Sequence, residues 1–68
     1  MNIKVTVNGE EKKFNAPLKL YDMLEQEGLV EMLIAVARNG TFIPKGNYLA
    51  VYLDDGDEIE IVAPMQGG

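Results

Sequence analysis

The stretch NIKVTVNG, residues 2–9, decides the fold because it joins a strict alternation to a strong turn signal. Isoleucine and valine alternate with polar residues across it, which is the pattern of a strand with one buried face. Asn8-Gly9 follows directly and suits a tight hairpin, because both central residues of a type I′ turn need positive φ. The sequence therefore predicts a hairpin whose second strand covers residues 10–15.

A second alternating segment, EIEIVA at residues 58–63, predicts the last strand. Its expected inward residues are Ile59 and Ile61, and its expected outward residues are Glu58, Glu60 and Val62. Because the first and last predicted strands are both rich in isoleucine and valine, we expect them to lie side by side in the middle of one sheet. The charged second strand of the hairpin, EEKKFN, suits a solvent-facing edge.

One helix is predicted between these strands, over residues 18–27 (LKLYDMLEQE). Leu20, Met23 and Leu24 have the i, i+3, i+4 spacing of a helix with one buried stripe. Gly28 suits the position just after a helix, where a left-handed conformation is common. We expect the stripe to form one core with the inward residues of the two central strands.

The remaining segments complete an α+β order. Residues 33–39 predict a further strand whose phase is open, because Ala35 and Ala37 would suit either face. Residues 41–43 are expected to pair briefly, and residues 45–53 fit either a short strand or irregular packing. A hairpin, a helix and two or three further strands predict a mixed sheet with the main helix on one face, which is the β-grasp arrangement.

The composition restricts the chemistry that this chain can perform. Its 68 residues include no cysteine and no histidine, which removes disulfides, thiol chemistry and the usual general base. We therefore expect a protein that is not an enzyme by itself. The net charge of −5 argues against nucleic acid as a partner. An apolar run of about 20 residues that could span a membrane is absent, as is a signal-peptide pattern, so we expect a cytoplasmic protein.

Four acidic residues gather in one predicted turn: Asp54, Asp55, Asp57 and Glu58. Clustered carboxylates can bind calcium, but these lack the ligand spacing of an EF-hand and its flanking helices. We therefore expect a solvated turn and no metal site.

The chain ends in VAPMQGG, residues 62–68. Pro64 cannot donate to a sheet ladder, so the sequence predicts a domain over residues 1–64 and a flexible diglycine tail over residues 65–68. Glycine, which lacks a side chain, can enter a narrow channel and let another protein's backbone approach closely. Small polar residues are also common in disordered termini, so the two glycines alone do not separate these interpretations.

Several motifs together resemble the ThiS/MoaD family of sulfur carrier proteins: Asn39-Gly40, Ile43-Pro44-Lys45, DGDEIEIV at residues 55–62 and the terminal glycine pair. The resemblance covers the whole chain and is strongest from residue 35 onward. The short length and the Asn-Gly and Ile-Pro-Lys motifs favour ThiS, the thiamine branch. The proline-containing ending is closer to MoaD, the molybdopterin branch.

The resemblance implies a reaction at the terminal carboxylate of Gly68, with Gly67 beside it. A ubiquitin-activating-like adenylyltransferase would adenylate this carboxylate with ATP, and a cysteine desulfurase or other donor would convert it to a thiocarboxylate. The sulfur would then pass to a thiazole synthase or to the large subunit of molybdopterin synthase. The chain itself would bind no cofactor, because the catalytic groups belong to its partners.

Apolar residues beside the reactive end are the predicted docking surface for these partners: Val62, Pro64 and Met65. Scattered apolar surface residues are also normal in soluble proteins. Three other functions remain open from the sequence. A ubiquitin-like modifier would join Gly68 to a lysine after the same activation step, and the others are a nucleic-acid module and a structural domain with an idle tail.

Overall fold

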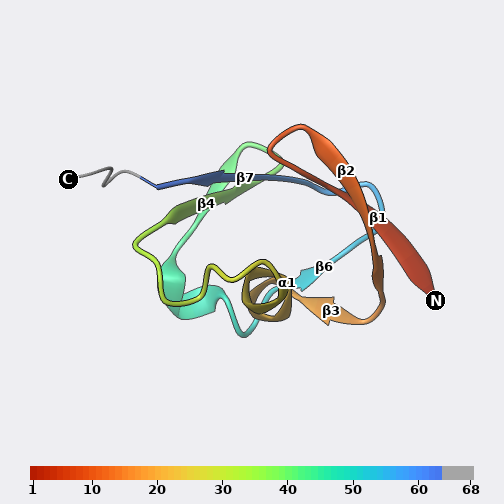
Figure 1. Cartoon of the computed structure of the whole chain (residues 1–68), viewed down its shortest axis with the longest axis horizontal. Coiled ribbons are helices and arrows are strands. Elements are labelled where there is room, and N and C mark those ends of the chain that lie inside the picture. Colours follow the sequence, from red (N-terminus) through yellow and green to blue (C-terminus); the bar gives the residue numbers. More distant parts are fainter. Residues whose placement is uncertain (64–68) are drawn as a thin grey trace.

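The computed structural model of the chain describes residues 1–63. In chain order its elements are β1 (Asn2–Val7), β2 (Glu10–Asn15), β3 (Leu18–Lys19), α1 (Leu20–Gln26), β4 (Ala35–Arg38), β5 (Thr41–Ile43), the 3-10 helix η1 (Lys45–Asn47), β6 (Tyr52–Leu53) and β7 (Glu58–Val62). Five strands form the main sheet in the order β2-β1-β7-β4-β5, and β3 pairs with β6 in a separate ladder. Helix α1 lies across one face of the main sheet, as Figure 1 shows. None of the helices within residues 1–63 combines the length and the apolar character needed to cross a bilayer.

The predicted pairing of the first and last strands is confirmed. β1 and β7 run parallel in the centre of the sheet, with Thr6 opposite Glu58. β4 lies on the other side of β7 and is antiparallel to it, with Ala35 opposite Val62. The sheet is therefore mixed, and with α1 on one face the chain has the predicted β-grasp fold.

Two Asn-Gly turns form the hairpins of this sheet, one between β1 and β2 and one between β4 and β5. Asn8 and Gly9 have φ of 51° and 85°, and Asn39 and Gly40 have φ of 51° and 84°. Both pairs thus adopt the left-handed conformation that the predicted type I′ turn requires. The charged β2 lies at the edge of the sheet as predicted. Its Lys12 contacts the end of the helix, with Nζ 2.7 Å from Oε1 of Glu27.

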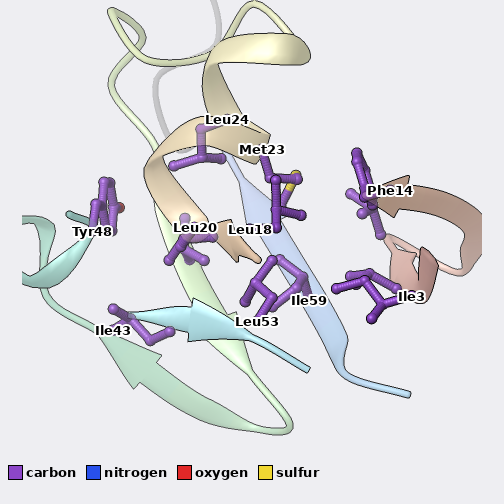
Figure 2. Packing of buried hydrophobic residues seen from close by; sticks show 13 residues of the cluster. Ile3, Phe14, Leu18, Leu20, Met23, Leu24, Ile43, Tyr48, Leu53 and Ile59 are labelled. Atoms are coloured by element: carbon purple, nitrogen blue, oxygen red, sulfur yellow. The ribbon is translucent and has the colours of Figure 1, made fainter. Parts of the chain in front are cut away.

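The core forms between α1 and the sheet, and the helical stripe predicted from the sequence faces it. Leu20, Met23 and Leu24 are fully buried, and Ile59 of β7 is 1% exposed. Figure 2 shows these side chains pointing toward one another, with Ile3 and Phe14 of the hairpin beside them. The predicted inward direction of the last strand is thus correct for Ile59. Its neighbour on that face, Ile61, is only half-buried and packs against the edge of the core.

The predicted bounds of the helix and of two strands differ from the structure. The helix ends at Gln26 instead of residue 27, and the last strand ends at Val62 instead of residue 63. The helix begins at Leu20 instead of residue 18, because Leu18 and Lys19 pair with Leu53 and Tyr52 as a short ladder. The strand expected over residues 33–39 is shorter, at Ala35–Arg38. The undecided segment 45–53 forms η1 and then β6.

The open phase of β4 is settled by Val36, which is 1% exposed and faces the core. Ala35 and Ala37 consequently lie on the outer face of the sheet, away from α1, because successive strand residues point to opposite faces.

Candidate functional site

The candidate site lies where β7 ends. Of the residues predicted to act there, Pro64, Met65, Gly67 and Gly68 lie outside the described residues. Val62 is described, as the last residue of β7, and its side chain is 58% exposed. β7 belongs to the central pair of strands in Figure 1, and Ala63, the last described residue, follows it.

Val62 belongs to an apolar strip on the outer face of the sheet. It lies opposite Ala35 of β4, and Ala37, two residues further along β4, lies opposite Phe42 of β5. Directly opposed residues share a face and contact each other. Phe42 is 63% exposed. We call Ala35, Ala37, Phe42 and Val62 the outer-face strip.

The sequence indicated only part of this strip. Val62 was predicted to face outward beside the tail, whereas Phe42 was expected only to take part in a brief pairing. The outward direction of Phe42 could have been inferred from its position two residues after Gly40. The Asn39-Gly40 turn fixes the register of β4 and β5, which places Phe42 opposite Ala37. Glu60, opposite Ala37, adds an exposed carboxylate next to the strip.

Near its end, β7 is also held by hydrogen bonds on the side that faces β1. The N–H of Ile61 donates to Oδ1 of Asn8 at 2.7 Å, and Nδ2 of Asn8 donates to the carbonyl oxygen of Ile61 at 3.2 Å. The sequence analysis gave Asn8 a role in the hairpin turn alone. Its contact with β7 depends on which strand lies beside the turn, and the residues around Asn8 in the sequence do not indicate that strand.

The acidic turn before β7 is exposed as expected at Asp54, Asp55 and Glu58, but the expectation is wrong for Asp57, which is buried at 6% exposure. Its Oδ2 accepts from Nε of Arg38 at 2.9 Å and from the N–H of Asp54 at 2.8 Å, and Nη2 of Arg38 lies 2.7 Å from the same oxygen. Oδ1 accepts from Nδ2 of Asn39 at 3.1 Å. Asp54, in contrast, is exposed, and its Oδ2 lies 3.0 Å from Nη2 of Arg38.

These partners determine the protonation state of Asp57. Burial acts to raise the pKa of its carboxyl group, but the hydrogen bonds from Asp54, Asn39 and Arg38, with the charge of Arg38, lower the pKa by more. The net pKa is below its ordinary value, so Asp57 is an ion at neutral pH. The positive charge that balances it comes from Arg38, and residues 1–63 contain no cluster of ligands that could hold a metal ion.

The described residues therefore form a surface that can bind another protein. Arg38 and Asp57 are occupied with each other, and the chain has neither histidine nor cysteine to act as a base or nucleophile. The arrangement can present an apolar face and a fixed strand end to another protein.

Comparisons with known proteins agree with this architecture. A model of the ThiS family matches residues 5–68. The solved structure of the thiamine biosynthesis protein ThiS from Geobacter metallireducens has a TM-score of 0.82 and 25% identity, covering 97% of this chain and 100% of that one.

Curated relatives add two further similarities. The uncharacterized protein ycf40 of Porphyra purpurea is 31% identical over 67 residues, which are 98% of this chain and 94% of that protein. A thiazole synthase of Paramagnetospirillum magneticum is 39% identical over 66 residues, or 97% of this chain. The chain spans only 20% of the length of that thiazole synthase.

Proposed function

This chain belongs to the ThiS family, and we propose that it is a sulfur carrier whose Gly68 carboxylate becomes a thiocarboxylate. The observation that carries the proposal is the family match, which continues through the terminal glycine pair. The fold supports it, because β7 lies in the centre of the sheet and ends at Val62, shortly before the terminal residues in the sequence. The hydrophobic core and the hydrogen bonds of Asp57 stabilise the folded domain, and the C-terminal tail would carry the sulfur.

The chemistry follows from the low reactivity of a free carboxylate. In the proposed sequence the carboxylate of Gly68 attacks the α-phosphate of ATP, pyrophosphate leaves, and an acyl-adenylate forms on the partner enzyme. A persulfide sulfur on a cysteine desulfurase or other donor then displaces AMP, so that a C–S bond replaces a C–O bond and an acyl disulfide forms. A thiol of the partner enzymes would then cleave the S–S bond, which releases the thiocarboxylate and leaves a disulfide. A difficult substitution is thereby divided into two easier ones. The adenylyltransferase and the donor supply the catalytic groups.

We propose a thiazole synthase as the acceptor of this sulfur. Proteins named thiazole synthase from Paramagnetospirillum magneticum and Magnetococcus marinus are 39% and 35% identical to this chain over 97% of its length. In each of them the similar region is 20% of a longer polypeptide. A carrier-like region within a thiazole synthase supports direct transfer between the two parts. The proline-containing ending keeps the molybdopterin synthase large subunit as the alternative acceptor.

The outer-face strip is the surface that we propose for docking the adenylyltransferase. Its exposed Val62 is the last residue of β7, and its exposed Phe42 lies on β5, on the far side of Ala37 of β4. The negative charge of the chain, with Glu60 beside the strip, would steer it toward a basic surface on that enzyme.

The test is the intact mass of the protein after incubation with ATP, the adenylyltransferase and a sulfur donor. We expect a gain equal to the exchange of one terminal oxygen for sulfur. A chain lacking Gly68, or extended by one residue, should show no gain, because a misplacement of about 1 Å can lower a rate about a hundredfold. Gly67→Ala should slow the reaction, since a methyl group narrows the fit in a channel shaped for backbone.

The same samples distinguish the alternatives. The melting temperature of each tail variant should match that of the parent, because the tail contributes no residue to the described core. Purified thiocarboxylate offered separately to a thiazole synthase and to a molybdopterin synthase identifies the acceptor. Activation without a thiocarboxylate, accompanied by an isopeptide bond to lysine, would instead establish a protein modifier.

A further inference from the structure

The two Asn-Gly turns hold opposite ends of the central strand β7. β1 runs parallel to β7, so the turn that follows β1 lies beside the later part of β7. β4 runs antiparallel to β7, so the turn that follows β4 lies beside its beginning. The same dipeptide is thus placed at both ends of one strand by the topology of the sheet.

At the beginning of β7, the backbone N–H of Asn39 donates to the carbonyl oxygen of Glu58 at 2.7 Å. In a regular antiparallel pair, the N–H of Glu58 would return a bond to the backbone carbonyl of Asn39. Here that N–H donates to the side-chain Oδ1 of Asn39 at 2.9 Å. The side chain takes the place of a backbone carbonyl that has turned away into the hairpin.

At the end of β7, Asn8 does the same in a parallel ladder. Its backbone N–H donates to the carbonyl oxygen of Ile59 at 2.9 Å. The next bond of such a ladder would run from the N–H of Ile61 to the backbone carbonyl of Asn8. It runs instead to Oδ1 of Asn8 at 2.7 Å, and Nδ2 of Asn8 also donates to the carbonyl oxygen of Ile61.

These bonds extend the support of β7 beyond the end of β1. β1 ends at Val7, so the side-chain amide of Asn8 satisfies both backbone groups of Ile61 on that side. On the other side β4 holds Val62 through its pairing with Ala35. The strand is therefore fixed from both sides immediately before Ala63, where the chain leaves the sheet.

We propose that Asn8 is a positioning residue for the transfer: its amide fixes the point and direction at which the tail leaves the sheet. This inference rests on the proposed function, because it concerns the reach of Gly68 into the partner's site. Asn39 forms equivalent bonds at the far end of β7 and contributes to stability alone. The two asparagines therefore allow a controlled comparison, because they bind opposite ends of the same strand, β7.

Asn8→Gly and Asn39→Gly are the matched variants. Both positions have φ of 51°, which alanine adopts only with strain, whereas glycine removes the side chain without strain. Each variant loses two side-chain hydrogen bonds, and one of those lost in Asn39→Gly goes to the buried carboxylate of Asp57. Because a bond to a charged group contributes more than a neutral one, Asn39→Gly should be destabilised at least as much as Asn8→Gly. A kinetic defect found only in Asn8→Gly therefore cannot be a general effect of lost stability.

The measurement is thiocarboxylate formation at saturating ATP and sulfur donor, with the carrier varied. We expect Asn8→Gly to lower kcat about tenfold or more, since misplacement of a reacting group affects the chemical step. The KM for the carrier should stay within about twofold, because the outer-face strip is intact. Asn39→Gly should keep both constants near those of the parent. Equal kcat values for the parent and Asn8→Gly would overturn the inference.

Amide hydrogen exchange gives a readout that does not depend on activity. The amide of Ile61 should exchange at least about tenfold faster in Asn8→Gly, after correction for global opening, and should be unaffected in Asn39→Gly. An unchanged rate at Ile61 would overturn the anchoring role of Asn8. A parent protein that never gains sulfur would overturn the proposed function and this inference together. Failure of the inference alone leaves the parent fully converted.

Discussion

Asp57 shows at the scale of single residues how a small acidic domain accommodates a buried charge. Its carboxylate receives bonds from Arg38, Asn39 and the backbone of Asp54, so it joins the end of β4 and the turn after it to the turn between β6 and β7. Because its folded-state pKa is below the unfolded value, the ion stabilises the fold at neutral pH. That contribution is lost as the pH falls from about 4 through the folded pKa.

Acidification should therefore affect the parent more than the Asp57→Asn variant. At pH 7 we expect the variant to be less stable by about 1–3 kcal/mol, because a charged buried acceptor has been removed. The difference should shrink as the pH is lowered below about 4. Urea unfolding at a series of pH values measures it. Glu60→Gln, which removes one exposed negative charge, is the control, and a difference that stayed constant down to the lowest pH would contradict the assignment.

Ile59 is the residue on which the inward direction of β7 depends. It is 1% exposed and packs against the helical stripe, as Figure 2 shows. Ile59→Ala should lower the free energy of unfolding by about 2–5 kcal/mol, through lost transfer energy and the cavity left behind. Val62→Ala on the same strand should change it by less than about 0.5 kcal/mol, because Val62 is exposed. Thermal or urea unfolding decides, and equal melting of Ile59→Ala and the parent would refute the packing.

At the scale of elements, the outer faces of β4, β5 and β7 form the candidate docking surface. Val62→Asp should weaken binding to the adenylyltransferase about tenfold, since burying one valine contributes about 1.5 kcal/mol. Leu49→Asp is the matched control, because Leu49 is 60% exposed but lines a hollow with Tyr21 of α1 on the helix side. Calorimetry on both variants measures the affinities, with circular dichroism to confirm that they fold. Equal affinity of Val62→Asp and the parent would leave Val62 an ordinary surface residue.

Elements that rest on local signals could be predicted from the sequence. The hairpin at Asn8-Gly9 follows from alternation and from the need for positive φ, and the buried stripe of α1 follows from helical spacing. The start of α1 could not be predicted, because Leu18 pairs with Leu53, which is 35 positions away by their numbering. Periodicity contains no information on such a partner. The segment around η1 was undecided for the same reason.

At the scale of the whole molecule, the position of a strand in the sheet could be predicted where its amino-acid composition depends on that position. The central pairing of β1 and β7 could be inferred because both strands are rich in isoleucine and valine. The polar contacts of the candidate site could not. Arg38 had no interpretation in the sequence, and its partner Asp57 was assigned to solvent, because neither residue reveals which turn the fold will bring beside it.

The parallel pairing of β1 with β7 also determines how the molecule responds to mechanical stretching. The chain enters the sheet at the first residue of β1 and leaves it at the last residue of β7, and these neighbouring strands run in the same direction. A force that draws those two points apart slides the strands lengthwise past each other. The bonds from Thr6 to Asp57 and from Asn8 to Ile59 are then loaded simultaneously, in shear, instead of opening one after another. Because forced unfolding is governed by the unfolding rate, a machine that pulls on this chain from its ends would meet its main resistance at the central ladder of the sheet.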